Sequence, residues 1–293
     1  MCAQVNPVKL EEIDIEKIPF KKKIEAFYEG TRAATELARQ VMIPLIKGLI
    51  KTSKKEEIIK GLYFRLYAWM LSLESLKDTV HFQATAAATR SVFELLLDIK
   101  LLIEDKPTDP IGKIDAFIQV EKFRVAEKYV NFKKSNPSLK YRPDLAKENL
   151  VKKQSEKDRI DQLILANWGR DKKGKPKRVD HWSGWDIAKR AREAGKDYEL
   201  FYHESFALLS WYMHSGLVGI KGMSAETLSA VFGNSHMLAA PMFLDATLLV
   251  AHELKLTQAI PQLKDWIKEA DLVTGRVIIE EHLKNLESEN TSK

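Results

Sequence analysis

Cysteine is nearly absent from the sequence, which contains only Cys2. One cysteine forms no internal disulfide and no cysteine metal cluster, so both are excluded. The phosphate-loop, dinucleotide-binding and zinc-protease motifs G-x-x-x-x-G-K-[ST], G-x-G-x-x-G and H-E-x-x-H are missing too, so those classes have no sequence support. His236, Asp245 and His252 follow one another at steps of 9 and 7, too far apart to bind one ion from one helix. We therefore expect no metal and no cofactor.

Long apolar runs are also missing. The longest, residues 237–251, is interrupted by Pro241 and Asp245 and is too short to cross a bilayer. The first residues show no basic region followed by an apolar run, so we expect no signal peptide. Together with the lone cysteine, these absences predict a soluble cytoplasmic protein without a membrane partner.

Positive charge is present and unevenly distributed. The net charge is +6, but residues 133–192 carry 18 Lys/Arg against 8 Asp/Glu, a local balance of +10 that leaves −4 for the remainder. Such asymmetry indicates an anionic partner, nucleic acid first and an acidic protein second. The alternative is a lysine-rich helix face that is merely solvated, and this plainer interpretation is favoured for the charge run alone.

Helical periodicity runs through the chain, whereas strand alternation and internal repeats are not seen. We predict an all-α fold, one domain over residues 1–293 made of about nine or ten helices, with a basic excursion at about 133–192. The expected helices cover residues 20–51 with a kink at Pro44, 53–76 with a Ser53/Glu56 capping box, 80–104, 111–132, 144–168, a short helix to Ala194 capped by Ser183, 198–215 with Asp197 as N-cap, a short one from Ser224, 235–254 and 261–286.

The helix at residues 80–104 is apolar except for one polar stripe. Its members are separated by 7, 4 and 4 residues and therefore share a face: Gln83, Arg90, Glu94 and Asp98. An unpaired buried charge is costly, so the rest of the chain must supply partners. The helix at 198–215 carries a matching stripe at steps of 4, 3 and 4: His203, Ala207, Ser210 and His214.

We expect the two stripes to meet in one hydrogen-bonded set made of Arg90, Glu94, Ser210 and His214. One interpretation is a buried polar network that fixes how the helices pack. The other is a pocket in which His214, poised by Glu94, transfers a proton or binds an anion, so these four are the candidate catalytic residues. The sequence favours the structural network.

Residues 169–185 form the most unusual segment, with two glycines, a proline and a cluster of cations before Asp180. The cations lie between three tryptophans, Trp168, Trp182 and Trp185, and are Arg170, Lys172, Lys173, Lys175, Lys177 and Arg178. Cations beside stacking surfaces suit RNA, so we take the six cations and Trp182 as candidate nucleic-acid contacts. In the alternative, Trp182 and Trp185 form an apolar plug beneath solvated lysines.

Three short motifs in this order resemble an uncharacterised bacterial family of all-helical proteins. They are R-S-x-x-E-L from Arg90, H-W-S-G from His181 and S-x-x-x-H-S from Ser210, within residues 64–219. The resemblance implies a helical bundle but no established activity. This family is in turn distantly similar to HEPN domains (higher eukaryotes and prokaryotes nucleotide-binding), which implies RNA cleavage or an inert role in phage-defence or toxin systems.

HEPN nucleases carry an arginine, four to six further residues and then a histidine, which act on the scissile phosphate. Arg276 and His282 match that spacing, although Val277 stands where the family usually has a polar residue. His214 has no arginine at that distance before it.

The sequence thus favours a non-enzymatic binding or regulatory module, in a bacterial defence or toxin–antitoxin setting, that holds RNA rather than DNA. One alternative is a metal-independent HEPN-like RNA endonuclease. Another is a protein-interaction scaffold that binds an acidic protein, and self-association is left open.

Overall fold

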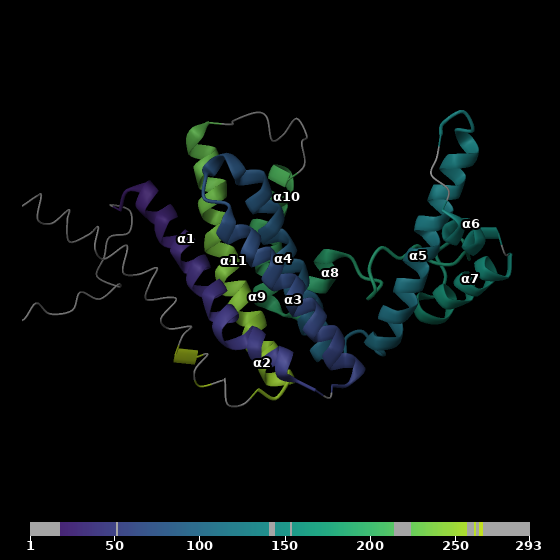
Figure 1. Ribbon diagram of the computed structural model, residues 1–293, viewed down its shortest axis with the longest axis horizontal. Coiled ribbons are helices and arrows are strands. Elements are labelled where there is room, and N and C mark those ends of the chain that lie inside the picture. The colour runs from purple at the N-terminus through teal and green to yellow at the C-terminus, as the bar shows by residue number, and fades with distance from the viewer. Residues whose placement is uncertain are drawn as a thin grey trace, which may run out of the picture. The chain divides into compact units, whose positions relative to one another are not determined.

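The protein is helical wherever the structure describes it (Figure 1). The computed structural model describes residues 18–50, 52–140, 144–152, 154–213, 224–256, 261 and 264–265, with the backbone alone at Lys152. Among these residues extended pairing is limited to one isolated bridge, between Arg170 and Pro176. The all-α prediction is confirmed. No described helix is both long and apolar enough to cross a membrane.

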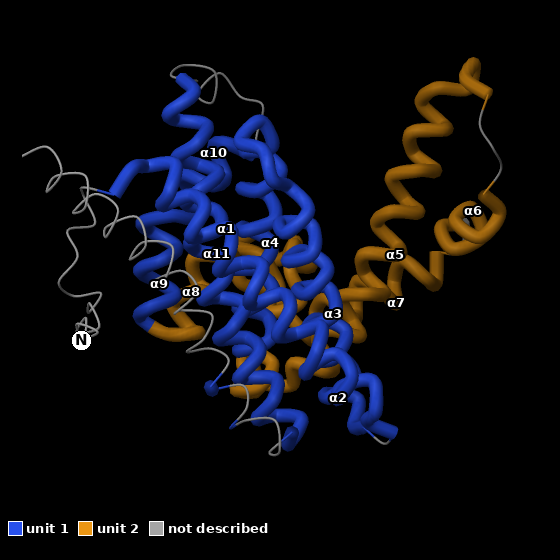
Figure 2. Tube along the Cα trace, turned by 60° about the vertical axis from the view of Figure 1, so that its left-hand side comes forward, with its two compact units in different colours: residues 1–100, 196–293 blue, residues 101–195 orange. Residues whose placement is uncertain are grey.

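The chain divides into two compact units (Figure 2). The first unit comprises residues 1–100 and 196–293, and the second comprises residues 101–195. The second unit includes the predicted basic excursion at residues 133–192. The assignment of one domain to residues 1–293 stays a prediction.

The first unit is a bundle built around α11. Its helices are α1 (Phe20–Leu37), α2 (Ile43–Gly48), α3 (Lys54–Ser75), α4 (Phe82–Ile103, of which the part to Lys100 belongs here), α9 (Lys196–Phe201), α10 (Ala207–Met213) and α11 (Ala225–Glu253). α1 and α3 pack against each other and against α11, and α10 also contacts α11. Buried apolar side chains fill the space between them, and burial of this kind is the main favourable term in folding.

Buried hydroxyl groups attach three helices to α11. Each of these hydroxyls has a partner, as burial in an apolar core requires. The contacts are Thr31 Oγ1 to His236 Nδ1 at 3.1 Å, Thr89 Oγ1 to the carbonyl of Ser235 at 2.9 Å, and Tyr63 Oη to Thr247 Oγ1 at 3.1 Å. Because a hydrogen bond is directional, these contacts fix the register of α1, α4 and α3 on α11.

The kink expected at Pro44 is present as a change of helix type. A π-helical segment, Ala38–Met42, joins α1 to α2, and Ile43 N–H donates to the carbonyl of Ala38, five residues back. Proline has no N–H to donate, so it suits the start of a helix, and Pro44 lies in the first turn of α2. The wider turn leads the chain into α2 without a full break.

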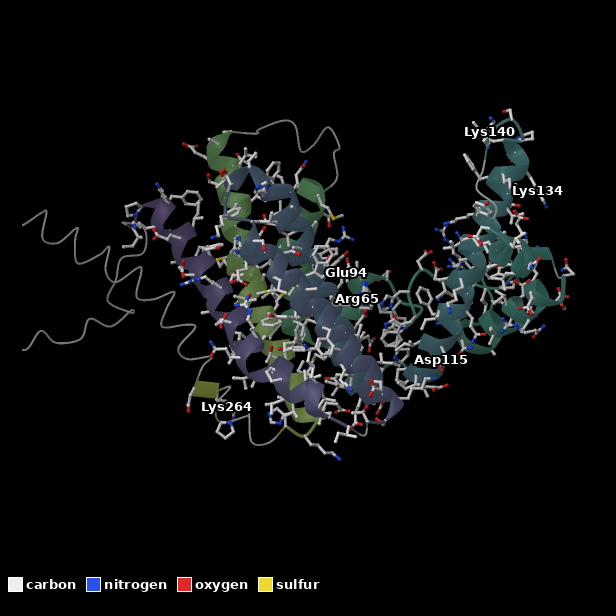
Figure 3. All side chains as sticks on the ribbon, viewed as in Figure 1. Arg65, Glu94, Asp115, Lys134, Lys140 and Lys264 are labelled. Carbon is white, nitrogen blue, oxygen red and sulfur yellow. The ribbon has the colours of Figure 1, made fainter. Side chains whose placement is uncertain are left out.

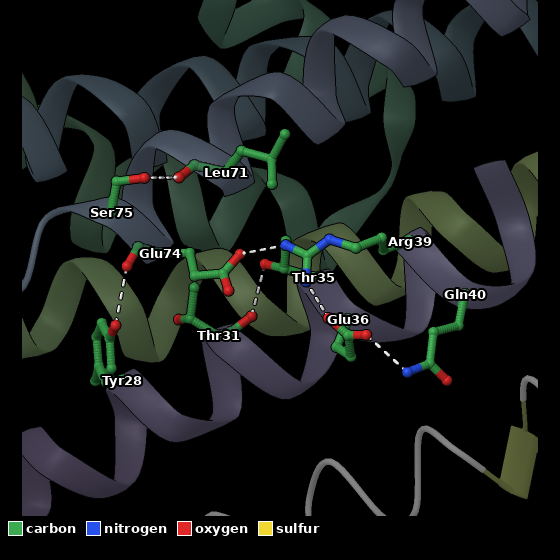
Figure 4. Close-up of polar contacts among 9 residues, drawn as sticks. All are labelled: Tyr28, Thr31, Thr35, Glu36, Arg39, Gln40, Leu71, Glu74 and Ser75. Carbon is green, nitrogen blue, oxygen red and sulfur yellow. Dashed lines mark hydrogen bonds and ion pairs between the residues drawn. The ribbon is translucent and has the colours of Figure 1, made fainter.

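Polar contacts join α1 to α3 at the outer edge of the bundle (Figure 4). Tyr28 Oη donates to the carbonyl of Glu74 at 2.9 Å, and Arg39 Nη2 lies 3.0 Å from a carboxylate oxygen of Glu74. Arg39, in the π-helical segment after α1, also pairs with Glu36. These pairs are partly exposed and therefore contribute less than the buried contacts.

The N-terminus of α3 is the capping box that the sequence predicts. Ser53 Oγ accepts from Glu56 N–H at 3.2 Å, and Ser53 N–H donates to the Glu56 carboxylate at 2.6 Å. These hydrogen bonds hold the pKa of Glu56 below its usual value. Arg65, labelled in Figure 3, is exposed, because Tyr63 and Leu66 occupy the buried face of α3.

α11 is one continuous helix, so the prediction of a break between Ser224 and Ser235 is wrong. Gly233 is buried inside this helix. A Cβ at Gly233 would lie 3.0 Å from Ile24 Cγ1, so glycine serves here to let α1 approach closely. The helix predicted at residues 261–286 lies almost wholly outside the described residues.

The second unit contains four further helices: α5 (Pro110–Ser135), α6 (Leu145–Lys152), α7 (Gln154–Trp168) and α8 (Ile187–Ala194). Asp109 caps α5 and Pro110 occupies its first position, as the sequence indicates. The expected helix 144–168 is divided into α6 and α7, which pack against α5 and against each other.

The core of the second unit lies between α5, α7 and the loop that follows α7. Its buried members are Val120, Phe123, Ile160, Ile164 and Val179. Ile118 of α5 is 46% exposed and Leu145 of α6 is 67% exposed, so neither apolar residue belongs to this core. α5 carries apolar residues on more than one side, so its periodicity does not identify the buried side.

Candidate functional site

Arg90 of α4 is the centre of the cluster predicted from the two polar stripes. Its Nε donates to Glu94 Oε1 at 2.9 Å, one helical turn along α4. Its Nη1 donates to Ser210 Oγ of α10 at 3.1 Å, and the Ser210 hydroxyl donates in turn to the carbonyl of Phe206 at 2.8 Å. Figure 3 labels Glu94 on α4. Three of the four candidate catalytic residues are thus brought together, and His214 lies outside the described residues.

An aromatic ring covers the Arg90 guanidinium, whose central carbon lies 4.6 Å from the centre of Phe206. That arrangement is a cation–π contact. Arg90 therefore contacts a carboxylate, a hydroxyl and a ring, while its side chain is only 23% exposed. This geometry favours a structural network that ties α4 to α10, because these contacts satisfy the charge.

His203 and Ala207 do not belong to this cluster, so that part of the stripe prediction is wrong. Both residues are exposed, whereas Phe206 is buried. The cause is a π-helical segment, Tyr202–Phe206, which widens the turn by about one residue and ends the α-helical spacing. Asp197 is also not an N-cap, because α9 begins at Lys196. The expected helix 198–215 is instead α9, the π segment and α10.

Gln83, at the start of the α4 stripe, is exposed and Asp98 is half-buried. His236 is buried beside Thr31, and Asp245 accepts a hydrogen bond from Tyr198. In the part of the chain that the structure describes, no three His, Cys, Asp or Glu side chains are placed to hold one metal ion.

The basic loop of the second unit is a hydrogen-bonded turn. We define the basic turn as residues 169–178. Asp171 N–H donates to the carbonyl of Lys175 at 2.8 Å, and Lys177 N–H donates to the carbonyl of Gly169 at 3.0 Å. Gly174 has a φ of +77°, which glycine adopts without strain. The loop thus has a defined frame, although irregular structure was expected.

The acidic group within the basic turn faces the backbone. The Asp171 carboxylate accepts from the backbone N–H groups of Lys173 and Lys175 at 2.8 and 2.9 Å. Lys177 is half-buried, and Arg178 pairs with Asp180 at 3.0 Å. The exposed candidate cations are Arg170, Lys172, Lys173, Lys175 and Arg178. The turn therefore presents exposed lysine side chains, while its carboxylate is bound by two backbone N–H groups.

Trp182 is buried and does not lie on the surface. Trp182 is 7% exposed, and its backbone carbonyl accepts a hydrogen bond from Trp168 Nε1 at 3.0 Å. Gly184 makes this packing possible, since its φ is +71° and a Cβ there would lie 2.5 Å from Trp168 Cδ1. The burial favours the plug interpretation for Trp182 over base stacking. Trp185 is half-buried, with Lys189 Nζ 4.6 Å from the centre of its ring.

The H-W-S-G motif is a compact turn held by its own side chains. His181 Nδ1 lies 2.8 Å from Ser183 Oγ, and His181 Nε2 lies 3.0 Å from Arg190 Nη1 of α8. A guanidinium only donates, so Nε2 accepts from Arg190, and the Ser183 backbone N–H lies 3.2 Å from Nδ1. Ser183 does not cap α8 as predicted. Asp186 does, accepting from Lys189 N–H at 2.8 Å.

Arg190 is the residue of this region that the sequence did not single out. It is 5% exposed although it follows Lys189 in a charged helix. The sequence gives only a weak indication that Arg190 is buried: it lies beside Ala191 and one turn before Ala194, and both alanines are buried. Through His181, Arg190 anchors the turn that follows the basic turn.

Comparison with protein-family models gives a match. The model of a family of unknown function (DUF5677) matches residues 56–227, more than half of the chain. The chain belongs to this family. The matched range of DUF5677 includes Arg90, Glu94, Ser210 and the H-W-S-G turn, so it agrees with the resemblance to an uncharacterised helical family. No curated protein and no solved structure matches. Likeness to HEPN domains stays a prediction.

Proposed function

We propose that this DUF5677 protein is a non-enzymatic binding module that holds RNA on its basic turn, residues 169–178. The observation that supports the proposal is the frame of the turn, in which Asp171 accepts from two backbone N–H groups while Lys172, Lys173 and Lys175 remain exposed. Phosphate contacts by lysine provide most of the sequence-independent affinity for nucleic acid.

The charge of the surroundings supports the same assignment. Residues 133–192 carry a balance of +10, while the rest of the chain is at −4. An anion approaching the turn is therefore attracted by the wider segment as well as by the turn itself. Because Trp182 is buried, affinity rests on charge, and we expect binding with little sequence preference.

The test is fluorescence anisotropy with a labelled single-stranded RNA across a salt series. In the test variant, Lys172, Lys173, Lys175 and Lys177 are all changed to Gln. We expect wild type to bind most tightly at low salt. We expect the variant to bind more weakly and with a flatter salt dependence, by about 0.7 log units in slope for each phosphate that a lysine no longer neutralises.

A charge-matched control separates the turn from general basicity. Its four changes remove exposed lysines elsewhere in the second unit: Lys122, Lys128, Lys134 and Lys140 to Gln. Figure 3 labels two of these, Lys134 and Lys140. If control and test variants lose affinity equally, or if wild type does not bind RNA at low salt, the proposal is wrong.

The ribonuclease remains the alternative proposal, because Arg90, Glu94 and Ser210 do meet. Its histidines, His214 and His282, lie outside the described residues. The RNA recovered from the binding assay distinguishes the two: intact RNA agrees with a binding module, and RNA cleaved by wild type but not by His214→Ala favours the nuclease.

A further inference from the structure

A row of apolar side chains lies exposed along α5. Ile118, Val125 and Phe132 are 46%, 51% and 57% exposed. They are separated by seven residues each, two turns of a helix, so they share one face. A periodic apolar stripe on a helix surface is the pattern of a helix–helix contact, whereas single exposed apolar residues are common and need no explanation.

An apolar groove between α5 and α6 continues this face. The groove has a volume of about 550 Å³. Its walls include Phe117, Ile118 and Val125 from α5 and Ala146 and Leu150 from α6. Small-molecule sites enclose their ligand and offer several convergent polar groups. This groove instead runs beside an exposed stripe and is lined mainly by aliphatic carbon, which suits the apolar side of a helix.

Cations flank the groove more than anions do. Glu121 is the carboxylate at its edge, and Arg124 lies 2.7 Å from it, which compensates its charge. Lys122, at the same edge, is exposed, and so is Lys128, less than two turns further on. Lys147, on the α6 side, pairs with Asp144 at 2.9 Å. The border of the groove therefore attracts negative charge.

We propose that the α5–α6 groove binds an acidic amphipathic helix of a partner protein. The stripe from Ile118 to Phe132 covers fourteen residue-to-residue steps, about 21 Å at 1.5 Å per step, which matches about four turns of a bound helix. Apolar residues of that helix at i, i+4 and i+7 enter the groove, and flanking Asp or Glu face Lys122 and Lys128. This surface is separate from the basic turn and does not depend on RNA binding.

The probe is a designed, fluorescein-labelled peptide helix of about 18 residues, roughly five turns, with leucine at those positions and glutamate at its flanks. Its partner peptide has the same leucines but lysine at the flanks. Both are titrated with the full-length protein and followed by anisotropy. We expect the acidic peptide to bind and the basic one to bind at least about tenfold more weakly.

Two variants locate the site. Ile118→Glu/Val125→Glu should weaken the acidic peptide by about tenfold or more, because it places charge against the apolar face. Lys122→Glu should weaken the acidic peptide and strengthen the basic one. The matched control, Val80→Glu/Leu200→Glu, changes residues that are 64% and 55% exposed in the first unit, and should bind normally. Circular dichroism of all variants checks that the fold is retained.

Several results would overturn the proposal: equal binding of both peptides, no binding of either, or acidic-peptide binding that survives Ile118→Glu/Val125→Glu. Sedimentation velocity provides a further test. A wild-type dimer that this double variant converts to monomer would show that a second copy of the chain occupies the face instead. Loss of RNA binding alone leaves the groove proposal intact, since that result concerns the basic turn.

Discussion

The buried imidazole of His236 should make the stability of this protein depend on pH. Burial lowers the pKa of His236 from 6.5 to about 4. The residue is 0% exposed, between Phe232 and Tyr28 rings whose centres lie 4.6 and 5.5 Å from its own. The Thr31 hydroxyl donates to a backbone carbonyl and so accepts from Nδ1–H. Among the described residues Nε2 has no hydrogen-bond partner, so a proton there would have no acceptor.

The direction and size of the effect follow from these two pKa values. In the unfolded chain His236 takes up a proton as the pH falls below 6.5, whereas in the folded protein it stays neutral until about pH 4. The unfolded state therefore binds more protons in this window, and stability is lost as the pH falls from 6.5 towards 4. Between pH 7 and pH 5 the loss from this group is about 2 kcal/mol, at 1.36 kcal/mol per pKa unit.

Urea denaturation of wild type and His236→Asn at pH 7, 6 and 5 measures this contribution. Asparagine keeps a polar atom near the position of Nδ1 but does not titrate, so other ionisable groups contribute equally to both proteins. We expect wild type to lose about 2 kcal/mol more than the variant between pH 7 and 5. Parallel pH dependence of the two proteins would refute the reasoning. The offset between them at pH 7 reports packing and does not enter the test.

Two further predictions concern the turn and the arginine cluster. Gly184→Ala should destabilise the protein by clearly more than Gly174→Ala, measured as the shift in urea midpoint. Both glycines have positive φ, but only a Cβ at position 184 would contact Trp168. Equal shifts would mean that backbone strain alone determines the effect. Arg90→Met and Ser210→Ala should show a coupling free energy of about 1 kcal/mol in a double-mutant cycle, and additive effects would mean that the 3.1 Å contact contributes nothing.

Residue spacing in the sequence predicted the contacts between residues that lie within about one helical turn of each other. The Ser53–Glu56 capping box and the Arg90–Glu94 pair each join residues three or four positions apart, so spacing alone defines them. Ser210 was found as a partner of Arg90 because a buried charge requires one. In contrast, the need for glycine at position 233 comes from the side chain of Ile24, 209 residues away in sequence. No local sequence pattern distinguishes this close approach of two helices from a helix break.

The two π-helical segments show why side-chain faces were harder to predict than helices. Ala38–Met42 precedes Pro44, so its wider turn has a local cause that the sequence reveals. Tyr202–Phe206 contains neither proline nor glycine, and nothing in its composition marks it. A wider turn rotates everything after it relative to everything before it, so a polar stripe counted across residues 202–206 does not describe one face. Arg90 therefore donates to Ser210, which follows the π-helical segment. His203 lies inside the segment and is exposed, so it does not join the cluster.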